Sequence, residues 1–307
     1  MAWSPKFMIQ NGALIPWAEG RIHPHALAVT YAATVFEGIR AYRHPTTGAY
    51  AVFKLDEHLA RIAQGVKIMR FEAPPTLDQM KSDILRLIPA NQPDDDVYVR
   101  LQVLIDGPGS QATMGPTGWT VVAIPRERSS GFNKGIAVGV SSWTRISDNA
   151  TPPRVKAVAN YHAGRLITLQ AKADGYDTAL ILNNQGKVSE GPGACVFILR
   201  DGKLITPNRN SDILESVTRD TMIQIAREMG FDVTEGLVDR TELYVADEIF
   251  LCGTGQELVP VTSVDRLMVG GGQPGPVTMQ LQARYESLVR GTTEDYPAWR
   301  TAVPMGA

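Results

Sequence analysis

The sequence predicts two domains that both mix helices and strands. The chain has 307 residues, of which 44% are hydrophobic, and segments of helical period alternate along it with short apolar runs. Such a chain forms one large domain or two of ordinary size. One polar break, PRERSSGFNK at residues 125–134, interrupts the pattern. We therefore expect a small N-terminal domain over residues 1–124, an interdomain loop over 125–134 and a large C-terminal domain over 135–307.

The N-terminal elements follow from turn chemistry and periodicity. FMIQNGALIP is typical of a β-hairpin, because Asn11 and Gly12 both tolerate positive φ. Residues 55–69 repeat apolar side chains every three or four positions and carry two acidic residues in the first turn, which predicts a helix. The other expected elements are a strand over 50–53, a helix over Leu77–Ile88 and strands over 97–105 and 119–124.

The C-terminal elements are bounded by glycines and tight turns. Predicted helices over Val158–Asp174 and Val217–Met229 are each followed by a glycine, a common helix terminator. Expected strands lie over 178–183, 195–199, 203–207 and 248–254, and a closing helix covers 275–291.

Composition narrows the class of function. Thirty basic residues against thirty-two acidic ones, without a basic stripe, argue against a nucleic-acid or membrane-surface partner. The two cysteines, Cys195 and Cys252, lie in apolar runs, as reduced thiols of a cytoplasmic protein do. We find no signal peptide, no run approaching the roughly 20 apolar residues of a membrane span, and no metal-ligand spacing among the histidines. Small-molecule chemistry is the remaining class.

RVKAVANYHAG, residues 154–164, places Lys156 among small apolar residues. Desolvation lowers the pKa of a lysine, and a neutral amine can form a Schiff base with a carbonyl cofactor. The alternative is a surface lysine whose stem packs while its ammonium reaches water. Tyr161, five residues later, can face the same cavity or can be an ordinary core tyrosine.

Three further motifs each allow a functional and a structural interpretation. Glu190 in VSEGPG can hold a proton on a heteroaromatic nitrogen, or can be a solvated loop residue. SVTRDT, residues 216–221, opens a helix whose N-terminus can bind an anion, although its hydroxyls can serve as caps alone. The Gly-Thr-Gly turn at 253–255 can present amides to a phosphate or carboxylate.

Three polar side chains of the N-terminal half are also candidates. Arg61, in the predicted helix, can clamp a phosphate or be solvated. Tyr98 and Arg100 alternate with valines and therefore share one face of their strand. That face is either at a wet sheet edge or inside a cleft that binds a carboxylate.

Taken in order, these motifs resemble the fold type IV pyridoxal-phosphate aminotransferases, and within them the branched-chain amino acid aminotransferases. The motifs are VTYAATVFEGIRAY, HLARI, YVR, VKAVANY, VSEGPG, VTRDT and TELYVADEIFLCGTGQELVPVTSVD. The similarity runs from residue 7 to about residue 293. It implies the two-domain α+β (α/β) architecture of class IV aminotransferases, pyridoxal 5′-phosphate as cofactor and a homodimer.

The resemblance also implies residue roles. Lys156 corresponds to the catalytic Schiff-base lysine, Glu190 to the carboxylate at the pyridine nitrogen, and Tyr161 to the phenol at the ring hydroxyl. The implied phosphate-binding residues are Arg61, Val217, Thr218 and Thr254. The implied substrate-binding residues, some contributed across a dimer interface, are Tyr31, Phe36, Gly38, Arg40, Tyr98, Arg100, Gly255 and Gln256.

The pattern departs from the family where the substrate binds. The carboxylate turn is Gly-Thr-Gly-Gln instead of Gly-Thr-Ala-Ala, Ala194 and Cys195 replace Glu-Asn, and Ser216 replaces a glycine. The interdomain loop carries Arg126 and Arg128 where aromatic residues are usual, and the sequence assigns neither arginine a role.

Our interpretation is a transaminase that moves an amino group from a branched-chain L-amino acid to 2-oxoglutarate by a ping-pong mechanism. The alternatives on the same scaffold are a D-amino acid or (R)-amine transaminase, a lyase of the aminodeoxychorismate type, and a non-catalytic cofactor-binding protein.

Overall fold

The computed structural model describes residues 3–305, which fall into two compact units. The first unit comprises the chain up to Glu127, the segment Val155–Ala159 and the chain from Ser287 on. The second comprises Arg128–Arg154 and Asn160–Glu286. The division after Glu127 lies within the expected interdomain loop. Two segments that we expected in the C-terminal domain, at residues 155–159 and at the C-terminus, belong to the first unit.

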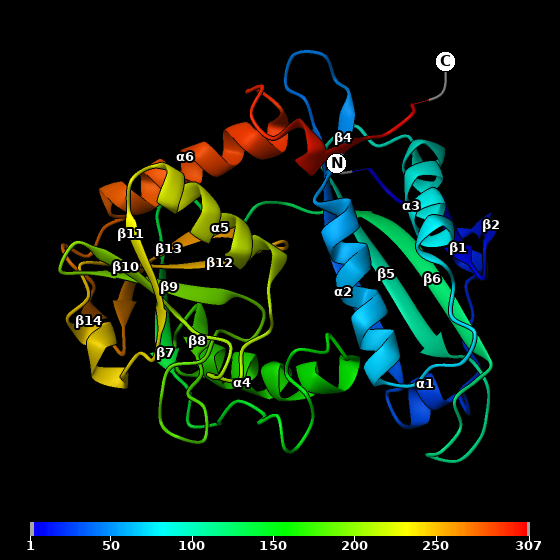
Figure 1. Ribbon diagram of the computed structural model, residues 1–307, viewed down its shortest axis with the longest axis horizontal. Coiled ribbons are helices and arrows are strands. Elements are labelled where there is room, and N and C mark those ends of the chain that lie inside the picture. Colours follow the sequence, from blue (N-terminus) through cyan, green and yellow to red (C-terminus); the bar gives the residue numbers. More distant parts are fainter. Residues whose placement is uncertain (1–2, 306–307) are drawn as a thin grey trace. The chain divides into compact units, whose positions relative to one another are not determined.

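A seven-stranded antiparallel sheet forms the body of the first unit, with strands in the order β15-β4-β3-β5-β6-β1-β2 (Figure 1). Helices α2 and α3 pack on one face of this sheet and against each other. The bounds are β1 (Phe7–Gln10), β2 (Ala13–Pro16), α1 (Leu27–Thr30), β3 (Thr34–Arg43), β4 (Tyr50–Phe53), α2 (Leu55–Ile68), α3 (Leu77–Asn91), β5 (Val97–Ile105), β6 (Thr117–Pro125) and β15 (Arg300–Ala302).

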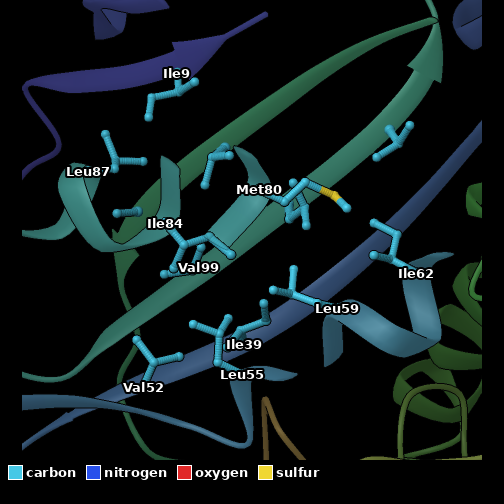
Figure 2. Close-up of a cluster of buried hydrophobic side chains, with 14 of the residues drawn as sticks. Ile9, Ile39, Val52, Leu55, Leu59, Ile62, Met80, Ile84, Leu87 and Val99 are labelled. Atoms are coloured by element: carbon cyan, nitrogen blue, oxygen red, sulfur yellow. The ribbon is translucent and has the colours of Figure 1, made fainter. Parts of the chain in front are cut away.

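The core of the first unit determines which side chains of its sheet face away from the helices. Odd-numbered residues of β3 and β5, such as Ile39 and Val99, pack with Leu55, Leu59 and Ile84 of the two helices (Figure 2). Successive side chains of a strand point to opposite faces of a sheet. The even-numbered residues of both strands therefore occupy the face away from α2 and α3.

Backbone pairing explains why two distant segments join the first unit. The amide of Phe36 donates to the carbonyl of Lys156 at 2.9 Å, and Val35 forms an antiparallel bridge with Ala157. At the C-terminus, β15 pairs antiparallel with β4. Local hydrophobic patterns report which residues are buried, and they carry no information on partners this far apart in the chain.

The second unit is built on a mixed eight-stranded sheet, in the order β11-β10-β9-β12-β13-β7-β8 with β14 paired to β13. Helix α5 contacts β11 and β12, and α4 contacts β8. The bounds are β7 (Ile136–Val140), α4 (His162–Ala173), β8 (Thr178–Leu180), β9 (Cys195–Arg200), β10 (Lys203–Pro207), α5 (Val217–Glu228), β11 (Asp232–Gly236), β12 (Glu248–Gly253), β13 (Glu257–Val264), β14 (Leu267–Met268) and α6 (Pro276–Arg290). Helix α6 starts in this unit, and its residues from Ser287 on belong to the first.

Most predicted elements are confirmed, but one helix start is wrong and several strands were not predicted. The hairpin turns at Asn11 and Gly12, both at positive φ, and α2 and α5 start at the predicted residues. The start of the predicted helix at Val158 is wrong, because Val158–Tyr161 forms a 3-10 turn before α4 begins at His162. No strand was predicted over β7, β11 or β13. None was predicted over β3 either, since Glu37, Gly38 and Arg40 interrupt its apolar run. Within residues 3–305, no helix is both long enough and apolar enough to cross a membrane.

Candidate active site

Lys156 lies beside β3, on the face of the first unit's sheet away from the helices. Its neighbours Val155 and Ala157 are buried in the core of the first unit. A hydrogen bond from the Ala157 amide to the Val155 carbonyl at 2.8 Å forms a tight turn at Lys156, whose own carbonyl accepts from the Phe36 amide of β3. The Lys156 Nζ atom lies 4.9 Å from the centre of the Phe36 ring. The apolar neighbours therefore anchor the backbone and present the amine.

Five of the expected substrate residues line the same face. Gly38 pairs with Arg100 and Arg40 with Tyr98 in the β3–β5 register, and Phe36 lies two residues before Gly38. A Cβ atom on Gly38 would lie 2.1 Å from the Tyr98 hydroxyl, so the tyrosine can occupy this place only beside a glycine. The structure therefore assembles these five residues around one surface with Lys156.

Tyr31, also expected at the substrate, lies outside strands β3 and β5. It follows the short helix α1 and is 51% exposed, and it precedes β3 in the chain. Its predicted role stays a prediction.

A buried cluster of charged and polar groups occupies the helix side of β3. Arg61 donates from Nε and Nη2 to the two carboxylate oxygens of Glu37, each at 2.7 Å. His58 Nδ1 lies 2.7 Å from the same carboxylate and donates to it, since an ionised carboxylate only accepts. Glu37 is fully buried and His58 nearly so. The expected two-point clamp of Arg61 on a phosphate cannot use the Nε–Nη2 edge, because Glu37 occupies it.

Burial and charge act in opposite directions on the two acid–base groups of this cluster. Burial alone would raise the pKa of Glu37, but the Arg61 charge, the proximity of His58 and their hydrogen bonds outweigh it and lower the pKa to about 2. Burial lowers the pKa of His58 despite the adjacent carboxylate. At neutral pH the cluster therefore holds one anion, one guanidinium and a neutral imidazole.

In the second unit, the start of α5 combines with the turn after β12. Ser216 caps the helix by accepting from the Arg219 amide at 3.2 Å. Thr218, in the first turn, places its hydroxyl 3.3 Å from that of Thr254. Two hydroxyls beside the positive end of a helix are suited to an anion. Val217, Thr218 and Thr254, expected together from the sequence, lie in this one place.

Glu190 lies near this helix start and is buried at 5% exposure. Its Oε1 atom is 2.8 Å from Arg145 Nη2, and its Oε2 atom accepts from the Leu214 amide at 3.2 Å. The Cys195 thiol lies 3.7 Å from Oε2. A carboxylate removed from water is stable only when opposite charge and donors surround it, which Arg145 and the amide provide. The interpretation of Glu190 as a solvated loop residue is therefore wrong.

The two glycine turns of the second unit lie against each other. A Cβ atom on Gly253 would be 3.2 Å from the carbonyl oxygen of Gly193, so this close approach favours glycine. Gly255 and Gln256 form the turn itself, closed by a hydrogen bond from the Gln256 amide to the Gly253 carbonyl at 3.1 Å. Tyr161, at the N-terminal end of α4, also belongs to the second unit.

Sequence reasoning missed three residues of these clusters: Glu37, His58 and Arg145. Glu37 was visible as a charge inside the apolar VFEGIR stretch, which is unusual enough in a strand to suggest a buried ion pair. Arg145 lies in a loop far from Glu190 in the chain, and no local pattern marks it. In the described residues, no group of three metal-ligating side chains occurs.

Comparison with known proteins identifies the family. The family model for class IV aminotransferases matches residues 34–264. The chain is 35% identical over 296 residues to the branched-chain-amino-acid aminotransferase of Salmonella typhimurium, which covers 94% of each chain. The chain belongs to the class IV aminotransferases.

Solved structures of this family include a cofactor-bound form. The branched-chain amino acid aminotransferase of Thermobaculum terrenum in its PLP form has a TM-score of 0.92 and 41% identity, covering 98% of this chain and 99% of that one. The branched-chain aminotransferase of Thermoproteus uzoniensis with norvaline has a TM-score of 0.92 and 32% identity, covering 98% and 99%. The predicted family, fold class, aminotransferase activity and pyridoxal-phosphate cofactor are confirmed.

The residues of this class IV aminotransferase fit that cofactor chemically. A phosphate suits the α5 N-terminus with the hydroxyls of Thr218 and Thr254. A protonated pyridine nitrogen suits the buried carboxylate of Glu190, and an aldehyde suits the amine of Lys156. When bound, the cofactor supplies the electron sink that stabilises a carbanion.

Proposed function

We propose that this class IV aminotransferase transfers the amino group of a branched-chain L-amino acid to 2-oxoglutarate. The observation that carries the proposal is the sheet face on which the Lys156 amine lies with the Phe36 ring and the Arg100 guanidinium. An aromatic ring suits an apolar side chain, and a guanidinium suits a carboxylate. The relatives named above as branched-chain-amino-acid aminotransferases support the same substrate class.

The proposed cofactor ligands are those that the family resemblance assigns. Lys156 would bind the cofactor covalently, Tyr161 would meet its ring hydroxyl and Glu190 would hold its pyridine nitrogen. Arg61, Val217, Thr218 and Thr254 bind the phosphate. Arg61 is already paired with Glu37, so it acts on the phosphate as a hydrogen-bond donor of fixed orientation more than as an uncompensated charge.

Two residues handle protons. The Lys156 amine, when not bound to the cofactor, would take the proton from the substrate α-carbon and give it up again within the same half-reaction, and the other half-reaction would use the same transfers in reverse. Glu190 keeps a proton on the pyridine nitrogen, and Arg145 keeps Glu190 negatively charged for that task. The kinetics would be ping-pong, because the donor's amino group would stay on the enzyme-bound cofactor after the first product leaves and before the acceptor binds.

The substrate residues divide by chemistry. Phe36, Gly38 and Tyr98 shape the apolar part of the pocket, whereas Gly255 and Gln256 offer the turn that meets the α-carboxylate. Tyr31, Arg40 and Arg100 complete the set. We further propose a homodimer, in which some pocket residues come from the partner. The cytoplasm is the proposed location, because Cys195 and Cys252 are free thiols.

The donor is tested by a half-reaction without an acceptor. The protein loaded with pyridoxal phosphate is mixed with L-leucine, L-valine, D-alanine or (R)-1-phenylethylamine, and the visible absorbance of the lysine-bound cofactor is followed. Rapid loss with L-leucine and L-valine is expected. Loss with D-alanine or the (R)-amine alone would replace the proposal by the D-amino acid or (R)-amine transaminase that the altered Gly-Thr-Gly-Gln turn favours.

The lysine is tested by Lys156→Ala. This variant should lack both the visible absorbance and turnover. A variant that kept both would refute the assignment.

A further inference from the structure

The guanidiniums of Arg100 and Arg126, both in the first unit, are held over aromatic rings. The central carbon of Arg100 lies 4.1 Å from the centre of the Phe36 ring, and that of Arg126 lies 5.4 Å from the centre of the Tyr98 ring. Stacking uses the flat face of a guanidinium and leaves its edge of N–H donors to bind a carboxylate at two points. Within residues 3–305, neither of these arginines forms an ion pair with a carboxylate.

Arg128, the second arginine of the interdomain loop, is paired with carboxylates. Arg128 Nε lies 3.1 Å from Glu257 Oε2, and its Nη2 atom forms an ion pair with Glu286. Two carboxylates of the second unit thus compensate Arg128, which ties the loop to the start of β13 and to α6. The structure separates two residues that the sequence could not distinguish: Arg128 is an anchor, whereas the charge of Arg126 is available.

The backbone at Arg126 is held by the sheet. Arg40 Nη2 donates to the Arg126 carbonyl at 3.3 Å, from the strand position that pairs with Tyr98. Arg40 is 1% exposed, so this contact is made by a side chain with little freedom. The loop residue is therefore positioned on the Lys156 face by a neighbouring strand and by the Tyr98 ring, although its own side chain is exposed.

The two stacked arginines suit a substrate that carries more than one carboxylate. Tyr98 and Arg100 are two residues apart on one face of β5, which separates them by about 6.6 Å along the strand. Arg126 lies over the Tyr98 ring, and Arg100 itself is the other residue of this pair on β5. A branched-chain 2-oxo acid carries one carboxylate, and 2-oxoglutarate carries two.

We propose that Arg126 binds the carboxylate that distinguishes a dicarboxylic 2-oxo acid from a branched-chain one, and so determines acceptor specificity. The inference rests on the proposed function, which it extends by naming the residue that recognises the acceptor. Arg126 is a specificity residue here, since it meets the substrate at a distance from the reacting carbon.

The test compares two acceptors on one variant. Protein loaded directly with pyridoxamine 5′-phosphate is mixed with 2-oxoglutarate or with 4-methyl-2-oxopentanoate, and the return of visible absorbance is followed. In Arg126→Gln, the concentration of 2-oxoglutarate that gives half the maximal rate should rise about tenfold, as expected for one charge-assisted hydrogen bond. The value for 4-methyl-2-oxopentanoate should change less than about twofold. Arg126→Lys should fall between, because lysine keeps the charge and loses the two-point geometry.

Arg70→Gln is the matched control. Arg70 is exposed, belongs to the same unit and lies at the end of α2, and its replacement removes the same charge. Both acceptors should be unaffected. A similar shift for 2-oxoglutarate in this control would mean that the effect in Arg126→Gln is one of net charge, and would overturn the proposal.

Two other outcomes also overturn it. If both acceptors weaken equally in Arg126→Gln, the residue binds the carboxylate that all 2-oxo acids share. If neither changes, it binds none. Because the acceptor reaction starts from the pyridoxamine-loaded protein, it needs no amino donor. Failure with L-leucine in the donor assay therefore contradicts the proposed function without deciding the role of Arg126.

Discussion

Replacing Glu37 by glutamine tests whether the buried cluster behind β3 stabilises the first unit. The carboxylate is fully buried, and its pKa falls from the ordinary 4.5 to about 2. A pKa lowered by this amount on folding corresponds to about 3 kcal/mol of stabilisation. The variant would leave the Arg61 guanidinium, whose side chain is 11% exposed, without this carboxylate, a loss that costs about 3–5 kcal/mol in buried pairs. Both routes predict a loss of about 3 kcal/mol, or a melting temperature lower by about 6–12 °C.

The pH dependence has a defined sign. Because the pKa of Glu37 is lower in the folded than in the unfolded protein, its contribution is complete above about pH 4.5. It is lost only as the pH falls from 4.5 towards 2. The contribution of Glu37's own ionisation to the stability difference between wild type and Glu37→Gln should therefore be constant from pH 8 to pH 5 and shrink below that range.

Urea unfolding followed by tryptophan fluorescence measures both effects. Glu72→Gln, at an exposed carboxylate of the same unit, is the control and should stay within about 0.5 kcal/mol of wild type. In an Arg61→Met background the cost of Glu37→Gln should become much smaller, because the guanidinium that needs the carboxylate is gone. A cost below about 1 kcal/mol in the wild-type background would refute the reasoning, because a buried ion pair cannot lose one partner so cheaply.

Three further predictions concern the other clusters. Glu190→Gln should retain the cofactor and slow the L-leucine half-reaction about 100-fold, since a neutral amide does not hold the ring proton. Stopped-flow absorbance measures this rate. A normal rate would mean that another group holds the proton on the pyridine nitrogen. Gly38→Ala places a methyl group 2.1 Å from the Tyr98 hydroxyl, so the ring must move and the KM for amino donors should rise about tenfold while the fold remains. An unchanged KM would exclude Tyr98 from the substrate. Cys195 and Cys252 should resist a thiol reagent at pH 8 until the protein is unfolded, because burial raises the pKa of both thiols. For Cys195, burial and then Glu190 raise the pKa to about 12. Rapid labelling of the native protein would contradict their burial.

The elements that sequence reasoning found are those whose signal is local. The hairpin at Asn11 and Gly12, helix α2 and the start of α5 follow from turn residues, periodicity and caps. Strand β3 was missed because its Glu37 is paired from a helix that comes later in the chain, so a charge in the strand looked like an interruption.

Among the site residues, too, sequence reasoning found those with a local signal. Lys156 and Glu190 were found from motifs in series, whereas the guanidinium that supports Glu190, from Arg145, was not. Nor could the sequence tell Arg126 from Arg128. The difference between them lies in which carboxylates the fold brings near, namely Glu257 and Glu286 beside Arg128 alone.

The segment Val155–Ala159 affects how the protein would behave after a proteolytic cut. The first unit is assembled from three separate stretches of chain, and its sheet is completed at one edge by β15 and beside β3 by the segment that carries Lys156. A single proteolytic cut between Glu127 and Arg128 would therefore yield two fragments held together by strand pairing within one sheet. If the cut chain is unfolded and refolded, recovery of the yellow colour of the bound cofactor would show that the strand pairing between the two fragments has formed again.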